Sequence, residues 1–279
     1  MASNPVFNRI DKQVRTGGYA GFGGQSGSPV SGGVQDSLNS QQLQDLYNKP
    51  SAGPAQMRRV TLDDVVMKTL GLFAVVVLVG AASWFTVAGN PSLSLPLLLG
   101  GMFGGLAVGL VIAFKKTISV PLIVLYSVLE GVLVGAISSV FERAWPGVVS
   151  TAVIATLCTF AGMFLGWKFG LIRVTDRSRR IFGMAILGYL LFSLVNVAAA
   201  FMGVGQGWGF GGSGPIGIGI SVLGVGLASY SLAIDFDSVD RAVAAQLPEK
   251  YSWLLAHGLI VTLVWLYLEI LRLLARLRE

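Results

Sequence analysis

Carboxylates inside apolar segments are the residues of this sequence best suited to chemistry. Glu130 lies near the middle of one such segment, in the stretch LYSVLEGVLVG of residues 125–135. A charged carboxylate at the centre of a bilayer costs at least about 2.5 kcal/mol on insertion scales, so it should face the bundle interior, protonated or paired. Tyr126 and Ser127, one helical turn earlier, are the expected hydrogen-bond donors. Glu130 is therefore either a neutral carboxyl that joins helices or a group that senses protons or ions.

A second acidic group follows another apolar segment, in the stretch AIDFDSVD of residues 233–240. Asp235, Asp237 and Asp240 are expected at the inner, cytoplasmic end of this segment. Clustered carboxylates repel one another, compete for protons and attract hard cations such as calcium. The alternative is a helix end that meets water, with the three carboxylates solvated in a loop.

The last apolar segment carries three further polar residues. Thr262 and Glu269 are seven residues apart, so they share one face of a helix. Glu269 is also close enough to Arg272 for an ion pair near the membrane surface. His257, the only histidine, makes no metal site alone; it either titrates near neutral pH or is a hydrogen-bonded structural residue.

These residues belong to seven apolar runs, each about long enough to cross a bilayer. Hydrophobic residues form 53% of the chain and charged residues 12%, against about 25% charged in soluble proteins. The sequence predicts an all-α polytopic bundle in which short connections make consecutive helices antiparallel neighbours. Glycines in the second and sixth runs predict close helix packing, with helix sliding as the alternative. The predicted spans are Val65–Ala88, Leu93–Phe114, Val120–Phe141, Val148–Phe169, Ile181–Met202, Ile216–Ile234 and Trp253–Leu271.

The distribution of Lys and Arg predicts a cytoplasmic N-terminus in the cell (plasma or inner) membrane. The last run conflicts with this rule, because a full crossing puts Arg272, Arg276 and Arg278 outside. We expect it to cross; the alternative is a segment that enters and returns. The opposite loops hold only Arg143. The inner side would hold Arg58, Arg59, Lys68, Lys115, Lys116, Lys168, Arg173, Arg177, Arg179, Arg180, Arg241 and Lys250.

Several function classes have no support in the sequence. The net charge of +6 comes from residues in short connections rather than from a basic patch with interleaved aromatics, so no nucleic-acid partner is expected. We find no catalytic, cofactor-binding or metal-binding motif, and no enzyme is predicted. Residues 1–60 are polar and rich in Gly, Ser, Gln and Asn, which predicts a disordered cytoplasmic tail ahead of a membrane domain of residues 61–279.

Longer stretches of the membrane part resemble the Bax inhibitor-1 family, particularly its bacterial branch with a long N-terminal tail. They are TLDDVVMKT from Thr61, YSVLEGVLVGAIS from Tyr126, the acidic run from Asp235, and TLVWLYLEILRLL from Thr262. The resemblance implies a seven-helix bundle with the last helix central. It also implies a calcium leak gated by pH through two buried aspartates on the sixth and seventh helices.

The chain departs from that implied pair at one position. The first aspartate matches Asp235, but the second matches Thr262, which does not ionise. Either Asp237 or Glu130 supplies the second carboxyl, or this branch lacks the pH gate. An arginine that partners the pair on the family's second helix has no counterpart within Leu93–Phe114.

Three functions remain at this point. The first is a passive pH-modulated leak for calcium or other cations, with Asp235 as the gate residue, Asp237 assisting and Glu130 as an intramembrane acid. The second is a non-transporting membrane protein that regulates a membrane protease or another membrane complex through its tail and helix surfaces. The third is a scaffold without a cavity. The lipid bilayer is the expected environment in each case, and no cofactor is expected.

Overall fold

Residues 58–279 are described by the computed structural model and form a bundle of long helices. Seven of these helices are long and apolar enough to cross a membrane, as predicted. In chain order the elements are α4 (Leu62–Gly89), the 3-10 helix η1 (Pro91–Leu93), α5 (Ser94–Phe114), α6 (Val120–Ala144), α7 (Val148–Lys168), α8 (Asp176–Phe201), the 3-10 helix η2 (Val204–Gly207), α9 (Pro215–Ala244) and α10 (Tyr251–Arg276).

Five of the seven helices, α4, α6, α8, α9 and α10, are longer than the apolar runs that predicted them, and α8 and α9 show why. Helix α8 begins at Asp176, because Thr175 and Ser178 form a reciprocal capping box one turn before the apolar run. Helix α9 continues ten residues beyond Ile234 to Ala244 and includes an Asp237–Arg241 pair at 2.9 Å, the i,i+4 spacing that supports a helix. The loop predicted as the alternative for the acidic run is therefore wrong, and the run is helical.

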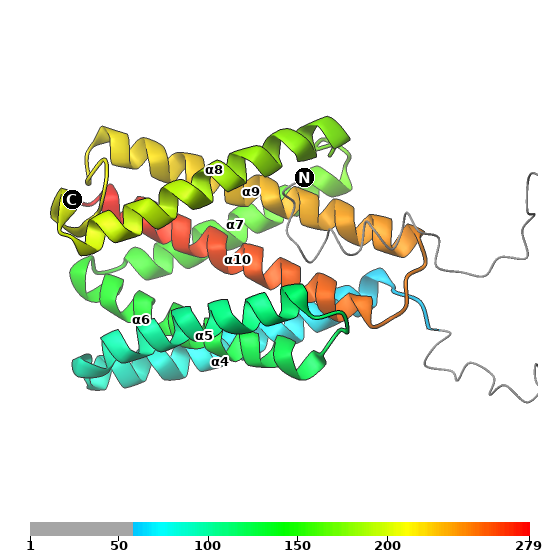
Figure 1. Cartoon of the computed structure of the whole chain (residues 1–279), viewed down its shortest axis with the longest axis horizontal. Helices are drawn as coiled ribbons and strands as arrows, with labels where there is room; N and C mark the ends of the chain where they lie inside the picture. Colours follow the sequence, from blue (N-terminus) through cyan, green and yellow to red (C-terminus); the bar gives the residue numbers. More distant parts are fainter. Residues whose placement is uncertain (1–57) are drawn as a thin grey trace, which may run out of the picture.

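Helix α10 is the centre of the bundle, as the family resemblance implies. Its most apolar window is 83% buried, against 11–39% for the other six spans. It packs against α4, α6, α7 and α9 (Figure 1). The helix is continuous over 26 residues and ends at the side opposite the start of α4 (Figure 1). A continuous helix of this length that joins the two ends of the bundle favours the expected full crossing over a segment that enters and returns.

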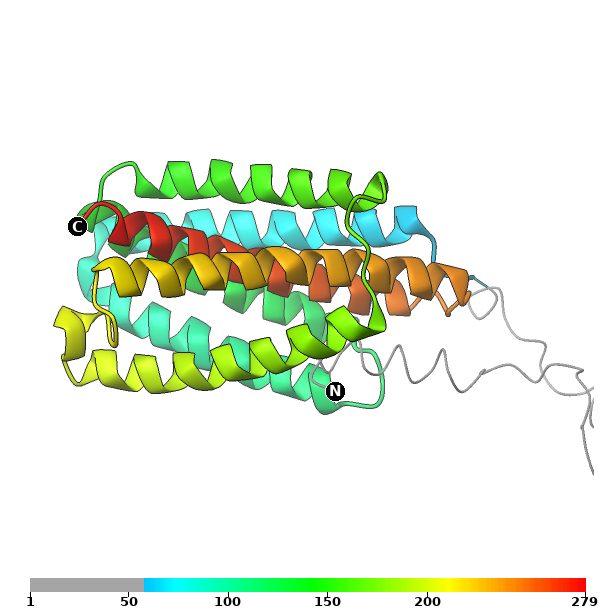
Figure 2. The ribbon, with the colours of Figure 1, turned by 90° about the horizontal axis from the view of Figure 1, so that it is seen from above.

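The expectation that consecutive helices are neighbours is wrong for two of the connections. Helix α4 packs mainly on α6 and α10, and α8 packs on α9 and η2. Figure 2 shows α7 and α8 on opposite sides of α9 and α10, joined by a long connection. A short connection sets the direction of a helix, but the shape of the helix faces decides which helix it contacts.

Glycines decide the closest of these contacts. A Cβ on Gly135 of α6 would overlap the backbone of Gly80 on α4, and one on Gly131 would lie 2.8 Å from the Cβ of Val79. The predicted packing role also holds for α5, where Gly101 faces the backbone of Leu133 on α6. It does not hold throughout α9, because Gly219 and Gly226 have no atom within 4 Å of an added Cβ.

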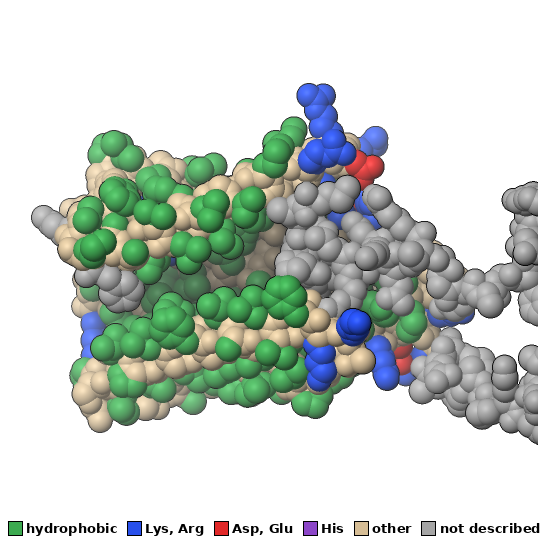
Figure 3. Space-filling view, viewed as in Figure 1, with side chains coloured by type: hydrophobic (Ala, Val, Ile, Leu, Met, Phe, Trp, Pro, Cys, Tyr) green, Lys and Arg blue, Asp and Glu red, His purple; other side chains and the backbone are tan. Residues whose placement is uncertain are grey.

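One end of the bundle carries most of the Lys and Arg side chains, and we call it the basic end. It contains the start of α4 and the α5–α6, α7–α8 and α9–α10 connections, while apolar side chains cover the helices between the two ends (Figure 3). Residues 58–60, which the sequence assigned to the tail, are ordered there: the Val60 amide donates to Leu247 at 2.8 Å. The rest of the predicted disordered tail lies outside the described residues.

Candidate functional site

The acidic run on α9 presents its side chains in different directions. Successive residues of an α-helix are rotated by roughly 100°, so Asp235 and Asp237 point roughly 200° apart. Between them Phe236 inserts among the aromatic rings of α7, with its ring centre 5.4 Å from that of Trp167. Asp240 is exposed at the basic end. The structure therefore separates Asp235 from the rest of the predicted cluster, whereas Asp237 and Asp240 remain close enough for their charges to interact.

Asp235 faces the central helix. Its side chain is 2% exposed, and its carboxylate accepts a hydrogen bond from the hydroxyl of Thr262 on α10. Arg179 of α8 is close enough to attract it electrostatically. Its Oδ2 has no hydrogen-bond partner among the described residues. The two positions that the resemblance pairs thus lie face to face, with a carboxylate on one side and a hydroxyl on the other.

Asp237 binds two arginines instead of a second carboxylate. It forms an ion pair with Arg179, and a second with Arg241 at 2.9 Å. The proposed role of Asp237 as the second carboxyl of an Asp235 pair is therefore wrong, because the Asp237 side chain projects from a different face of α9 than the Asp235 side chain. The resemblance implies an arginine on the second helix, α5, whereas the arginine that contacts Asp237 from another helix here, Arg179, comes from α8.

Arg179 was counted in the sequence only as a basic residue of a connection. The capping box formed by Thr175 and Ser178 would have placed it on a helix. Its side chain is 10% exposed, so the guanidinium lies within the packed part of the protein rather than in water.

Glu269 is the centre of a second polar contact, nearer to the opposite end. The carboxylate is 3% exposed and accepts hydrogen bonds from Tyr189 of α8 at 2.8 Å and from Trp265 at 3.1 Å. Its expected partner Arg272 lies 3.4 Å away. Gly224 of α9 makes room for this group, because an added Cβ would lie 2.6 Å from a carboxylate oxygen. Sequence reasoning missed Tyr189, which no local pattern distinguishes.

These contacts give α8 an unusual attachment. It packs on α9 over a short stretch, and its most apolar window is only 11% buried, the lowest value among the spans. Figure 3 shows a hollow in the surface between α8 and α5. Among the described residues, Arg179 links α8 to the aspartates of α9, Tyr189 links it to Glu269 of α10, and Asn196 links it to the loop after η2. The links to α9 and α10 depend on carboxylates.

Glu130 belongs to a different group of residues. Its carboxylate accepts a hydrogen bond from Tyr126, as predicted, and faces Gly105 of α5. Ser127 donates instead to the carbonyl of Ile123, so the second expected donor is wrong. The Tyr126 ring meets the buried ring of His257 edge to face at 4.5 Å between centres. Glu130 therefore cannot act as the second carboxyl for Asp235, since α10 separates α6 from α9 (Figure 1).

His257 is 3% exposed on α10. Its Nδ1 has no hydrogen-bond partner within residues 58–279, so the ring is held there by packing against Tyr126. In the same part of the chain, no three His, Cys, Asp or Glu side chains come together as they would around a metal ion.

The far end of α10 is anchored by an arginine that sequence reasoning treated only as a charge to be counted. Arg276 is 3% exposed, donates to Ser221 of α9 at 2.8 Å and to the carbonyl of Gly217, and lies over the ring of Trp208 at 5.2 Å. The three arginines at the end of the last span therefore conflict less with the preference of Lys and Arg for the cytoplasmic side, because the charge of Arg276 is inside the protein.

Comparison with known proteins identifies the family of the chain. The model of the family described as Bax inhibitor 1 like matches residues 4–279. None of the curated proteins compared with the chain matches it. Because the family match extends over nearly the whole sequence, the chain belongs to the Bax inhibitor 1 like family.

Proposed function

We propose that this protein is a passive, pH-modulated leak for calcium or other cations. The observation that supports this most directly is the attachment of α8 through carboxylates within apolar spans. A helix held by few apolar contacts and by charged groups can change position when those groups gain protons.

The sign of the pH effect follows from the partners of the carboxylates. Asp235 accepts a hydrogen bond from the Thr262 hydroxyl of α10 and lies near Arg179 of α8, which also pairs with Asp237. Protonation of Asp235 removes the negative charge with which this carboxylate attracts Arg179. Acidification therefore weakens the link between α8 and α9, and cation flux should rise as the pH falls.

A second link joins α8 to the central helix. Glu269 of α10 accepts hydrogen bonds from Tyr189 of α8 and from Trp265, and pairs with Arg272. Glu130 adds an intramembrane acid on the other side of α10. Exposed Asp240 attracts cations at the basic end.

We further propose that the basic end faces the cytoplasm of the cell membrane. Arg58, Lys68 and the basic residues of three connections lie at this end, whereas Arg276 at the opposite end is buried. Cytoplasmic connections carry the excess of Lys and Arg in membrane proteins. The N-terminus would then be cytoplasmic.

Calcium flux into liposomes that contain the purified protein tests the proposal. Wild type should pass calcium faster as the pH falls across the range of about 5 to 8, where perturbed carboxylates titrate. Asp235→Asn should give a higher and nearly constant flux, because the amide cannot carry the charge that attracts Arg179. Thr262→Val, which removes only the hydroxyl, should shift the pH midpoint. Asp63→Asn makes the same charge change at an exposed residue of α4 and should behave as wild type.

Flux equal to that of empty liposomes at every pH would overturn the proposal. Deletion of residues 1–56 separates it from the alternative function, a regulator of another membrane complex. A leak formed by the seven helices should survive this deletion, whereas regulation through the tail should be lost.

A further inference from the structure

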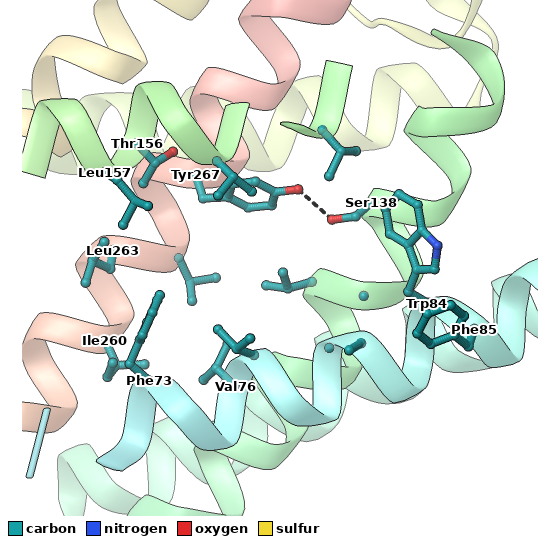
Figure 4. A pocket seen from close by; sticks show the side chains of 18 residues that line it. Phe73, Val76, Trp84, Phe85, Ser138, Thr156, Leu157, Ile260, Leu263 and Tyr267 are labelled. Atoms are coloured by element: carbon teal, nitrogen blue, oxygen red, sulfur yellow. Dashed lines mark hydrogen bonds between the residues drawn. The ribbon is translucent and has the colours of Figure 1, made fainter. Parts of the chain in front are cut away.

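A cavity of about 430 Å³ lies between α4, α6, α7 and α10, away from the carboxylates described above (Figure 4). This volume is within the range of about 300–1,000 Å³ that small-molecule sites usually have. The lining runs from Phe73 and Ile260 at the middle of the bundle to Phe85 and Val149 near the opposite end. We call it the α4–α7 cavity.

The lining offers almost nothing to an ion or to water. Its buried hydroxyl groups already have partners: Ser138 and Tyr267 bond to each other at 2.6 Å, and Thr156 donates to the carbonyl of Ala152 at 2.7 Å. The remaining lining side chains named in Figure 4 are hydrophobic, Trp84 among them. A water molecule needs two to four polar partners to occupy a cavity, so an apolar occupant fits this site.

The mouth opens sideways onto the lipid-facing surface. The lining residues from α4 and α7 include Val77, which is 50% exposed, and Val153 and Leu157, which are 42% and 47% exposed. By contrast, Leu263 and Val264 of α10 are only 8% and 9% exposed and form the inner wall. The cavity is thus continuous with the surface that bilayer lipids cover.

We propose that the α4–α7 cavity binds one acyl chain of a bilayer phospholipid. The chain enters between α4 and α7 from the leaflet at the opposite end, with its methyl end near Phe73 and Ile260. An apolar, slender occupant matches both the lining and the lateral mouth. The residues before Arg58 are polar and rich in glycine, so this segment of the chain does not match the lining.

Photolabelling in vesicles tests this assignment. The protein would be reconstituted in phosphatidylcholine vesicles doped with phosphatidylcholine that carries a diazirine at one acyl terminus, irradiated, digested and mapped by mass spectrometry. Any surface lipid can label Val153 and Leu157. Helix α10 is enclosed by its neighbours, so label on Leu263 and Val264 requires a chain inside the cavity. The expected result is label on both sets of residues.

A filled cavity provides the matched comparison. Val134 lines the cavity on α6, whereas Val140 of the same helix is 36% exposed and lies outside it. Val134→Trp should lower labelling of Leu263 and Val264 by about tenfold or more relative to Val153, because the indole takes up much of the space. Val140→Trp should leave the ratio unchanged.

Label in wild type confined to Val153 and Leu157 would overturn the proposal, and this result does not depend on the folding of any variant. Equal labelling of Leu263 in wild type and Val134→Trp would also overturn it. A probe with the diazirine close to the glycerol should move the label from Ile260 toward Val149; the reverse movement would refute the assigned direction.

Discussion

Gly135→Ala should destabilise the bundle by forcing α4 and α6 apart. The added Cβ would lie 2.8 Å from the Cβ of Ser83 and still closer to the carbonyl of Gly80, where the neighbour is backbone and cannot rotate away. Ordinary contact begins near 3.4 Å. The two helices must therefore separate by roughly 0.6 Å or more, and a gap of about 0.5–1 Å forfeits a quarter to a half of each dispersion contact.

The loss in free energy of unfolding caused by Gly135→Ala can be bounded. Overpacking of this kind costs about 1–3 kcal/mol, occasionally more, whereas Ala in place of Gly favours a helix by about 1 kcal/mol at most. A net loss of about 2 kcal/mol corresponds to a decrease in Tm of about 4–8 °C for a protein of this size class. Thermal unfolding of the purified protein in one detergent, monitored by tryptophan fluorescence, measures this decrease in Tm.

Gly100→Ala is the matched control. Gly100 lies on α5, and no atom lies within 4 Å of an added Cβ. The same chemical change should leave Tm unchanged or slightly higher. If Gly135→Ala and Gly100→Ala gave the same Tm, the close α4–α6 contact would not contribute to stability, and the packing argument would be refuted.

Two further changes test the polar anchors of α10. Glu269→Ala should lower the free energy of unfolding by about 1–3 kcal/mol, because buried Tyr189 and half-buried Trp265 lose their acceptor. Glu269→Gln keeps an acceptor oxygen and should cost less in the same unfolding assay. Equal losses for the two variants would contradict the role of the hydrogen bonds. Arg276→Met should lower the free energy of unfolding by a similar amount, about 1–3 kcal/mol, because it removes buried hydrogen-bond donors. Arg278→Met, at an exposed residue, serves as the control. If both variants had the Tm of the wild type, an anchoring role for Arg276 would be excluded.

Much of the fold could be predicted from local patterns. The seven spans follow from hydrophobic length, since a bilayer requires about 20 apolar residues for each helix. The central position of α10 was not visible in this way; it came only from the family resemblance. Its composition resembles that of the other spans, and burial on all sides depends on where the other helices pack.

The site was harder to predict for a related reason. The hydrogen bond from Tyr126 to Glu130 is local, four residues apart on one helix, and the sequence predicted it. The contact between Tyr189 and Glu269 joins residues 80 positions apart. Periodicity reports which residues share a face, but not which face of another helix they meet.

The sequence by itself determined the membrane environment, the seven helices and the acidic residues that interrupt them, because these depend on composition and on regular helical spacing. Only the tertiary structure decided the partners of those acids. It placed Asp235 against Thr262 and Asp237 against Arg179, left Glu130 on the other side of α10, and attached α8 through Tyr189 and Glu269. The physical reason is that side chains two positions apart on a helix point in nearly opposite directions and therefore meet different helices. Which helices these are depends on close contacts, such as those at glycines, between segments far apart in the sequence.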